Sequence, residues 1–366
     1  MNPIIHFLGI CIKFFLINIK AELLYLKQKN TILNTNEINT IVFTHNLGGG
    51  TESYVRKNFY NPNILIIRLI SYRNDSFFIL EHEKEKRAIK LNSLFQFLNK
   101  LELDRIIVNS LCAYNKPSRI INYVLSRKDN CSITYLVHDY HSACPSVMFI
   151  QGKKFCQYKC ENCSIGKKEI IEWRNNWERF LSNCNNIICF SKSSKEILCR
   201  FYEEIESKIQ VIPHSMDYCN FTSLNLDLNC RNVAIIGNCS NIAKGKLVIK
   251  NLIPEFKKSK NRKLYIIGKV PFLFHHNSKY VKYTGPYDLK FLPETLKSGK
   301  IGVIVFTSIW PETFSYAISE FMKLGLYIVS LELGAQGEKL KNYDKAIFVA
   351  NLEAKTIMEG IEKCFI

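Results

Sequence analysis

Two glutamates eight residues apart are the side chains best placed to do chemistry. Glu312 and Glu320 lie in the stretch WPETFSYAISEFMKLGLYIV at 310–329, where Pro311 predicts a helix that begins near Thr313. Eight residues of helix span about 12 Å along the axis. That is about the distance between the sugar and the ribose of a nucleotide-sugar, and a carboxylate accepts two hydrogen bonds from a vicinal diol.

The start of this helix is a predicted anion site. The backbone N–H groups of Thr313 and Phe314 would have no partner within the helix, and a helix N-terminus attracts negative charge. A diphosphate suits that position, with one carboxylate on the sugar side and one on the ribose side.

This stretch resembles the Glu-x7-Glu motif of retaining GT-B glycosyltransferases, in particular family 4 of the bacterial polysaccharide and O-antigen type. The resemblance extends to Met322, Leu324 and Gly325. It implies two Rossmann-like domains that face a central cleft, with Glu312 on the donor sugar and Glu320 on the ribose. It also implies metal-independent transfer of a hexose or deoxyhexose from a UDP-, GDP- or dTDP-sugar to a glycan or lipid-linked glycan. As a bare spacing, the two glutamates would also suit an ordinary amphipathic helix.

A second loop resembles the family's Gly-Arg-x5-Lys-Gly loop, whose Arg and Lys hold the donor pyrophosphate. It is GNCSNIAKG at 237–245, with Lys244 at the Lys position and Asn238 at the Arg position. Asparagine donates hydrogen bonds without a charge. We therefore expect weaker donor binding, a second basic side chain, or a non-catalytic glycosyltransferase-like partner in a polysaccharide assembly complex. Taken alone, Lys244 would be a surface lysine.

Three glycines form the candidate ligand loop of the first domain. Gly48, Gly49 and Gly50 follow a predicted strand and precede a helix at 51–57, and glycine lets a backbone approach a ligand at a helix start. The dinucleotide-binding Gly-x-Gly-x-x-Gly pattern is absent. The resemblance implies that this loop faces the donor phosphates and the acceptor, whereas a flexible turn is the alternative.

A histidine follows another predicted strand of this domain, at 132–137. His138 lies in a His-Asp-Tyr sequence, and the resemblance implies that it contacts the transferred sugar and acts in catalysis with Lys244 and Glu312. Asp139 either orients His138 or caps the next turn.

Four cysteines have a spacing that can supply zinc ligands in a reduced protein. They follow the pattern C-x11-C-x3-C-x2-C and are Cys144, Cys156, Cys160 and Cys163. A zinc ion here would be structural and would hold a loop over the acceptor side; small buried residues are the alternative. No cofactor is expected for catalysis, because the Asp-x-Asp of the metal-dependent GT-A class is absent from the sequence.

The elements that position these residues repeat as a short apolar run followed by an amphipathic stretch, which predicts an α/β fold with parallel strands covered on both faces. The predicted strands are 40–44, 64–70, 105–108, 132–137, 186–190 and 209–212, then 232–236, 263–267, 281–284, 302–306, 326–330 and 346–349. A polar segment separates the two sets. We predict a helical leader at 1–38, an acceptor-side domain at 39–228 and a nucleotide-sugar-binding domain at 229–366.

Composition narrows the possible partners. The 366 residues are 47% hydrophobic and carry a net charge of +18, which excludes a disordered chain and favours anionic partners. Nucleic acid is not expected, because the basic residues are dispersed and no recognition motif occurs. For residues 1–30 we predict a helix that either packs against the rest of the folded chain or lies on a membrane surface. The 14 cysteines in a chain with no visible secretory leader indicate a cytoplasmic protein, peripheral at the inner face of the plasma membrane if the charge binds acidic lipid.

Overall fold

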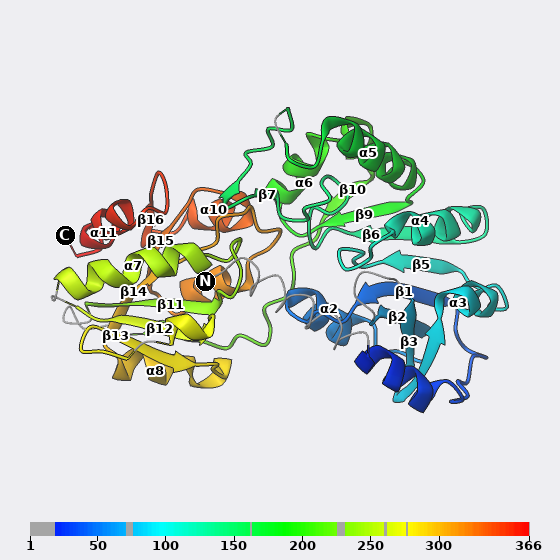
Figure 1. The fold of residues 1–366 in the computed structure, drawn as a ribbon, viewed down its shortest axis with the longest axis horizontal. Coiled ribbons are helices and arrows are strands. Elements are labelled where there is room, and N and C mark those ends of the chain that lie inside the picture. Colours follow the sequence, from blue (N-terminus) through cyan, green and yellow to red (C-terminus); the bar gives the residue numbers. More distant parts are fainter. Residues whose placement is uncertain are drawn as a thin grey trace. The chain divides into compact units, whose positions relative to one another are not determined.

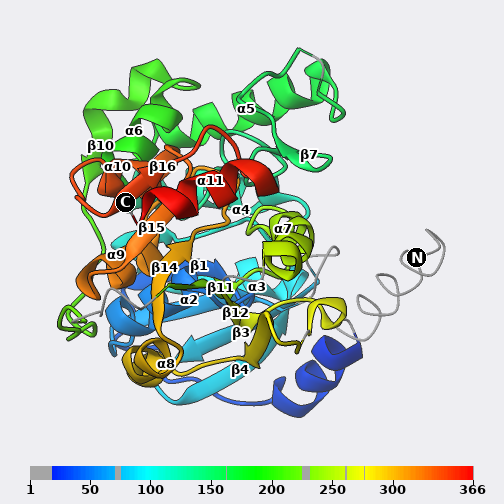
Figure 2. The same cartoon turned by 90° about the vertical axis from the view of Figure 1, so that its left-hand side faces the viewer.

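The computed structural model describes residues 19–70, 76–161, 163–224, 231–259, 262–275 and 277–365. The chain forms two compact units, each built around a parallel β-sheet (Figures 1 and 2). The first comprises 1–147, 168–190 and 197–212, and the second comprises 148–167, 191–196 and 213–366.

The sheet of the first unit has eight strands in the order β10-β9-β6-β5-β1-β2-β3-β4. The six predicted strands are confirmed, and all pair in parallel. Their bounds are β1 Thr40–His45, β2 Ile64–Leu69, β5 Arg105–Val108, β6 Ser132–Leu136, β9 Asn186–Cys189 and β10 Ile209–Val211.

An antiparallel hairpin, β3 Phe77–His82 and β4 Glu85–Lys90, extends this sheet beyond β2. Neither strand was predicted from the sequence. β4 reads EKRAIK and is an edge strand with a partly exposed face, whereas β3 reads FFILEH and is largely buried. Polar residues are typical of sheet edges, which explains the omission of β4 but not that of β3.

Helices connect the strands of the first unit. They include one over 19–28, whose buried Ala21 packs with Ile79 and Ala88 of the hairpin. Residues 1–18 of the predicted leader lie outside the described residues. The other helices are α2 Gly50–Asn58, α3 Leu91–Leu98, α4 Pro117–Ser126, α5 Lys167–Ser182 and the 3-10 helix η1 Glu203–Lys208. Helix α6 Lys192–Cys199 is divided between the units, with 192–196 in the second.

The sheet of the second unit is parallel throughout, in the order β13-β12-β11-β14-β15-β16. All six predicted strands are confirmed: β11 Asn232–Asn238, β12 Leu264–Lys269, β13 Val281–Gly285, β14 Ile301–Val305, β15 Tyr327–Ser330 and β16 Ala346–Phe348. Numbered along the chain, this order is 3-2-1-4-5-6, the Rossmann arrangement, which binds ligands where the order reverses at the carboxyl edge. That point lies between β11 and β14.

Helices cover both faces of this sheet. Along β11, Val233 and Ile235 pack into one apolar core with α7 and α11, whereas Ala234 and Ile236 pack into a second core with α8 and α9. Figure 1 shows α7 and α8 on opposite sides of the strands. The helices are α7 Lys246–Ser259, α8 Leu292–Ser298, α9 Tyr316–Lys323, α10 Gly334–Leu340 and α11 Ala354–Lys363, with 3-10 turns η2 Phe272–Phe274 and η3 Leu289–Phe291.

A small hairpin, β7 Ile150–Gln151 and β8 Lys154–Phe155, lies between β6 and α5 along the chain. Within the described ranges, none of the helices has the length and hydropathy needed to cross a bilayer.

Candidate functional site

Two loops of the second unit meet where its strand order reverses. The loop after β11 ends at Gly245, which has φ +92°, and a Cβ there would lie 2.3 Å from the Thr307 side chain in the loop after β14. Thr307 Oγ1 donates to the carbonyl of Lys244 at 2.9 Å, and the Ile309 amide donates to the carbonyl of Ala243 at 2.8 Å. These contacts fix the predicted phosphate loop against the Glu312 segment.

Lys244 and Glu312 form an ion pair, Nζ to Oε1. Glu312 is only 6% exposed, so burial alone would raise the pKa of its carboxyl; the charge and hydrogen bond of Lys244 outweigh this and hold that pKa below its usual range. The Lys244 ammonium also lies 5.4 Å from the ring centroid of Trp310. Because the Lys244 side chain remains 36% exposed, a ligand can reach its charge while Glu312 stays ionised beneath it.

The helix between the two glutamates begins later than the sequence predicts. Helix α9 starts at Tyr316, and its N-cap residue Ser315 has a left-handed backbone with φ 60°. Thr313 and Phe314 therefore lie in the preceding loop, and the prediction that their N–H groups open the helix is wrong. The helical rise of 12 Å does not apply to the Glu312–Glu320 pair either, because Glu312 is not helical.

Helix α10 explains the late start. A Cβ on Gly334 would lie 2.5 Å from Pro311 Cα, so α10 packs directly against this loop. The Gln336 side chain accepts a hydrogen bond from the Glu312 amide at 2.9 Å and donates to the Trp310 carbonyl at 2.8 Å. Because these tertiary contacts hold 310–312 in place, Pro311 cannot serve as the first residue of the helix.

Glu320, on α9, is 7% exposed and accepts a 2.7 Å hydrogen bond from the hydroxyl of Tyr218. Burial raises the pKa of Glu320, and the Tyr218 hydrogen bond and the charge of Lys339 oppose that rise. Sequence analysis missed Tyr218, which lies in the polar segment between the two predicted sets of strands. Its hydroxyl orients the carboxylate that we assign below to a ribose.

Lys339 is a second basic residue of this site that sequence analysis missed. Its Nζ donates to the Ser315 carbonyl at 3.2 Å and to Ser319 Oγ at 2.6 Å, and lies 3.3 Å from the ring centroid of Phe314. Burial lowers the pKa of Lys339 to about 7, although three glutamates oppose this fall. They are Glu312, Glu338 and Glu320.

Asn238, at the position where the resembling family has arginine, is exposed and shapes its own loop. Its Oδ1 accepts hydrogen bonds from Ser240, from the amide at 3.3 Å and from the hydroxyl at 2.7 Å. Because Asn238 has no charge, the sequence predicts a further basic side chain near the site, and Lys339 is a lysine that the tertiary structure brings to the start of α9.

In the first unit, the glycine loop leads from β1 into α2. Gly48 has φ 79° and Gly49, the N-cap of α2, has φ 78°. A Cβ at either position would meet nothing within 4 Å, so the backbone conformation, and not the space, favours glycine there. Gly50 is the first residue of α2.

His138 lies directly beyond β6, with its Nε2 2.9 Å from Asn109 Oδ1. Its ring packs against Tyr54 and Phe190, with centroids 5.1 and 4.6 Å away. Asn109 is fully buried and donates from Nδ2 to Thr44 Oγ1 at 3.0 Å. Asn109 therefore orients His138, a role that its place in a short polar turn did not reveal.

Asp139 caps the turn after β6. Its carboxylate accepts from the Ser110 hydroxyl and from the His141 amide, each at 2.9 Å. Burial raises the pKa of Asp139, and these hydrogen bonds oppose the rise. Of the two predicted roles of Asp139, these contacts support the capping role.

The four predicted zinc ligands do not come together as a metal site. Among the residues that the structure describes, no three His, Cys, Asp or Glu side chains are arranged to hold a metal ion. As the structure describes them, these cysteines therefore do not form the predicted zinc site, and none of Cys144, Cys156, Cys160 and Cys163 is in a disulfide.

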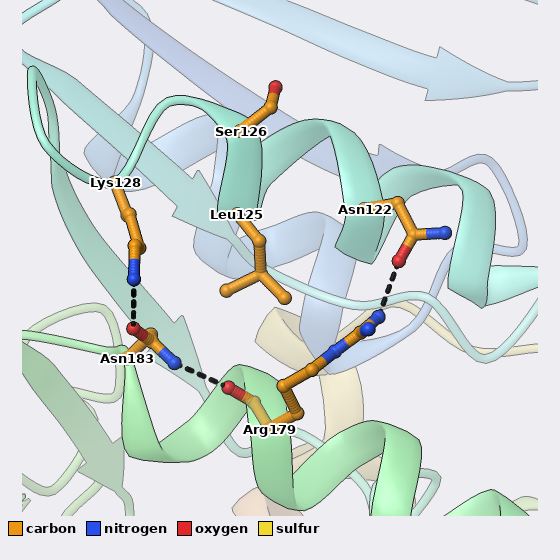
Figure 3. Close-up of a pocket in the computed structure, with 6 residues that line it drawn as sticks. All are labelled: Asn122, Leu125, Ser126, Lys128, Arg179 and Asn183. Carbon is orange, nitrogen blue, oxygen red and sulfur yellow. Dashed lines mark hydrogen bonds between the residues drawn. The ribbon is translucent and has the colours of Figure 1, made fainter.

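A polar groove between α4 and α5 contains none of the predicted site residues (Figure 3). Arg179 donates to Asn122, and Lys128 donates to Asn183 at 3.3 Å. Because its polar groups satisfy one another, we assign no ligand to it.

Comparisons with known proteins agree with the fold. No protein-family model matches the chain, and no curated protein matches it. Sucrose-phosphate synthase from Thermosynechococcus elongatus is similar in structure, with 14% identity over 89% of each chain and a TM-score of 0.58. HepE from Anabaena, in complex with UDP and glucose, has 12% identity over 89% of each chain and a TM-score of 0.55.

A third similar structure is WaaB, a lipopolysaccharide outer core galactosyltransferase, with 13% identity, a TM-score of 0.52, and coverage of 88% of this chain and 90% of WaaB. Sequence identities this low support a shared fold but not a shared function. With the two Rossmann-like sheets described above, the chain has the GT-B fold, which confirms the predicted fold class.

Proposed function

We propose that the protein is a retaining glycosyltransferase of the family 4 type that moves a sugar from a nucleotide-sugar to an acceptor hydroxyl. One observation carries the proposal. Two buried glutamates, Glu312 and Glu320, lie with Lys244 and Lys339 on loops and helices that follow the carboxyl ends of β11, β14 and β15. Ligands of a Rossmann-like sheet bind at this edge. The HepE structures with UDP and with UDP-glucose support such a donor.

The donor diphosphate takes its positive charge from two lysines. Lys244 is the partly exposed cation of the loop after β11, and Lys339 supplies the charge that Asn238 lacks. The first N–H groups of α9 add donors, because the Ser315 side chain makes no capping hydrogen bond to them. Positive groups fixed in advance at a leaving group stabilise the charge that develops in the transition state.

The two carboxylates hold the two ends of the donor. Glu320, oriented by Tyr218, accepts hydrogen bonds from the ribose diol, and Glu312 accepts from hydroxyls of the sugar. For the first unit, the resemblance assigns His138 to the transferred sugar, and Gly48, Gly49 and Gly50 to the phosphates and the acceptor.

The transfer breaks the bond between the anomeric carbon and the diphosphate oxygen and forms one between that carbon and the acceptor oxygen on the same face. The resemblance implies front-face transfer, in which the departing phosphate takes the acceptor proton. The products are the glycosylated acceptor and a nucleoside diphosphate. Lys244 and Lys339 stabilise the diphosphate as it leaves.

We further propose a glycan or lipid-linked glycan as acceptor, in surface polysaccharide synthesis at an anionic membrane surface. The net charge of +18 supports this location. Asn238 favours a second candidate, a non-catalytic partner protein in a polysaccharide assembly complex.

A panel of UDP-, GDP- and dTDP-sugars distinguishes the two candidates. Calorimetry measures binding of each to the full chain, and release of nucleoside diphosphate with and without a glycan acceptor measures turnover. An enzyme binds one donor and releases its nucleotide; a non-catalytic partner releases none. Lys355→Gln, at an exposed position of α11, is the matched control for variants of Lys244 and Lys339.

A further inference from the structure

A groove of about 270 Å³ in the first unit, beside the helix at 19–28, gathers positive charge. Figures 1 and 2 show this helix, in dark blue, next to the β3–β4 hairpin. Among the described residues that line it, there is no aspartate or glutamate. The cations among them are Lys29, Arg87, Lys90 and Lys100. Like charges gathered without a counter-charge repel one another, so they indicate an anionic ligand.

Aromatic rings hold two of these cations in place. Lys90 Nζ lies 5.0 Å from the ring centroid of Tyr25, and Arg87 Cζ lies 5.7 Å from that of Phe97. The Nε of Arg87 is buried and, among the described residues, has no hydrogen-bond acceptor. A buried donor without an acceptor is costly.

The helix beside this groove exposes apolar side chains to solvent. Leu23 is 61% exposed and Leu26 56% exposed, whereas Ala21 is buried against the hairpin. Residues three apart lie on one face of a helix, so the two leucines form an apolar face next to the basic groove. Ile32, just beyond the helix, is 85% exposed.

We propose that this groove binds the phosphate of an anionic phospholipid headgroup while Leu23 and Leu26 enter the membrane interface. An amphipathic helix with adjacent cations is the arrangement that binds such surfaces. The inference names a surface for the membrane association proposed above and does not depend on glycosyl transfer, because it uses none of the donor-site residues.

Sedimentation with lipid vesicles tests the proposal with the full chain. One vesicle set is phosphatidylcholine, and the other adds phosphatidylglycerol. We expect binding to the anionic vesicles only, and about a 30-fold weaker affinity for the double variant Arg87→Gln/Lys90→Gln, since each basic residue near such a surface contributes about 1 kcal/mol. Leu23→Ser/Leu26→Ser should also weaken binding.

The matched control is Lys355→Gln/Lys363→Gln, which removes the same charge from exposed positions of α11. Equal binding to both vesicle sets would overturn the proposal. So would an equal loss in the control and groove variants, because binding would then follow net charge alone. Donor binding stays at the wild-type level in the groove variants, which separates this test from that of the proposed function.

Discussion

Replacing Lys244 with methionine tests whether the ion pair with Glu312, in the proposed donor site, stabilises the folded protein. Methionine keeps the apolar stem beside Trp310 and removes the charge. Breaking a fully buried pair costs about 3–5 kcal/mol. Because the Lys244 side chain is 36% exposed, solvent screens part of its interaction with Glu312. We therefore expect a loss of about 2 kcal/mol in the free energy of unfolding.

The loss of stability in Lys244→Met depends on pH, and the ionisation of Glu312 determines the direction of that dependence. In the wild type the pKa of Glu312 is lowered, so its stabilisation is present above the unfolded pKa of 4.5 and disappears as pH falls through the folded value. Without Lys244, burial raises the pKa of Glu312, and the variant loses stability as pH rises through that value. The difference between the two proteins is therefore largest near neutral pH and smallest in acid.

Urea unfolding followed by tryptophan fluorescence measures this difference, with Trp310 beside the pair. The Glu312→Gln and Lys244→Met/Glu312→Gln variants complete a double-mutant cycle. The double variant should be more stable at neutral pH than Lys244→Met alone, because no buried charge is left unpaired. A pH-independent loss, or a double variant no more stable than Lys244→Met, would refute this reasoning.

Three further predictions concern binding and turnover. Glu320→Gln should weaken nucleotide-sugar binding about 10-fold, which corresponds to one hydrogen bond to a charged group, and Tyr218→Phe should weaken it less. Calorimetry measures these affinities, and an equal loss of affinity in an unrelated surface variant would contradict the prediction. Lys339→Met should weaken binding of a nucleotide-sugar but not of its uncharged nucleoside. Since the pKa of Lys339 is about 7, Lys339 loses its charge as pH rises above that value, and the affinity of the wild type for the nucleotide-sugar should fall. The same dependence of affinity on pH in Lys339→Met would disprove the assignment. Asn109→Leu should lower turnover while donor affinity stays within about 2-fold, because it orients His138 without contacting the donor phosphates; a fall in affinity alone would count against this role.

Most of the fold was predictable from local patterns. Continuous apolar runs identified all twelve predicted strands, which are the strands that pair in parallel in the two sheets, since a strand covered on both faces must be apolar throughout. The β3–β4 hairpin was not predicted: Glu85–Lys90 is a polar edge strand, but Phe77–Leu80 of β3 is an apolar, largely buried run like those of the strands that were predicted.

The site was predictable only in part. Glu312, Glu320 and Lys244 could be selected from their motifs, and the pairing of Glu312 with Lys244 agrees with that choice. The predicted start of helix α9 was wrong because Gln336 and Gly334, which are distant in the sequence, contact the preceding loop and hold it in a non-helical conformation. Lys339 and Tyr218 belong to no local pattern, since only the folded chain brings them to the carboxylates. The cysteine spacing was compatible with a zinc site, but spacing says nothing of whether the thiols converge.

Calorimetric titration of the 366-residue chain with UDP-, GDP- and dTDP-sugars tests the central claim most directly. The account predicts saturable binding of at least one donor, weakened by Glu320→Gln and by Lys339→Met and unchanged by Lys355→Gln. Binding of none of them, or equal binding by wild type and both site variants, would contradict a sugar-nucleotide site in the second unit.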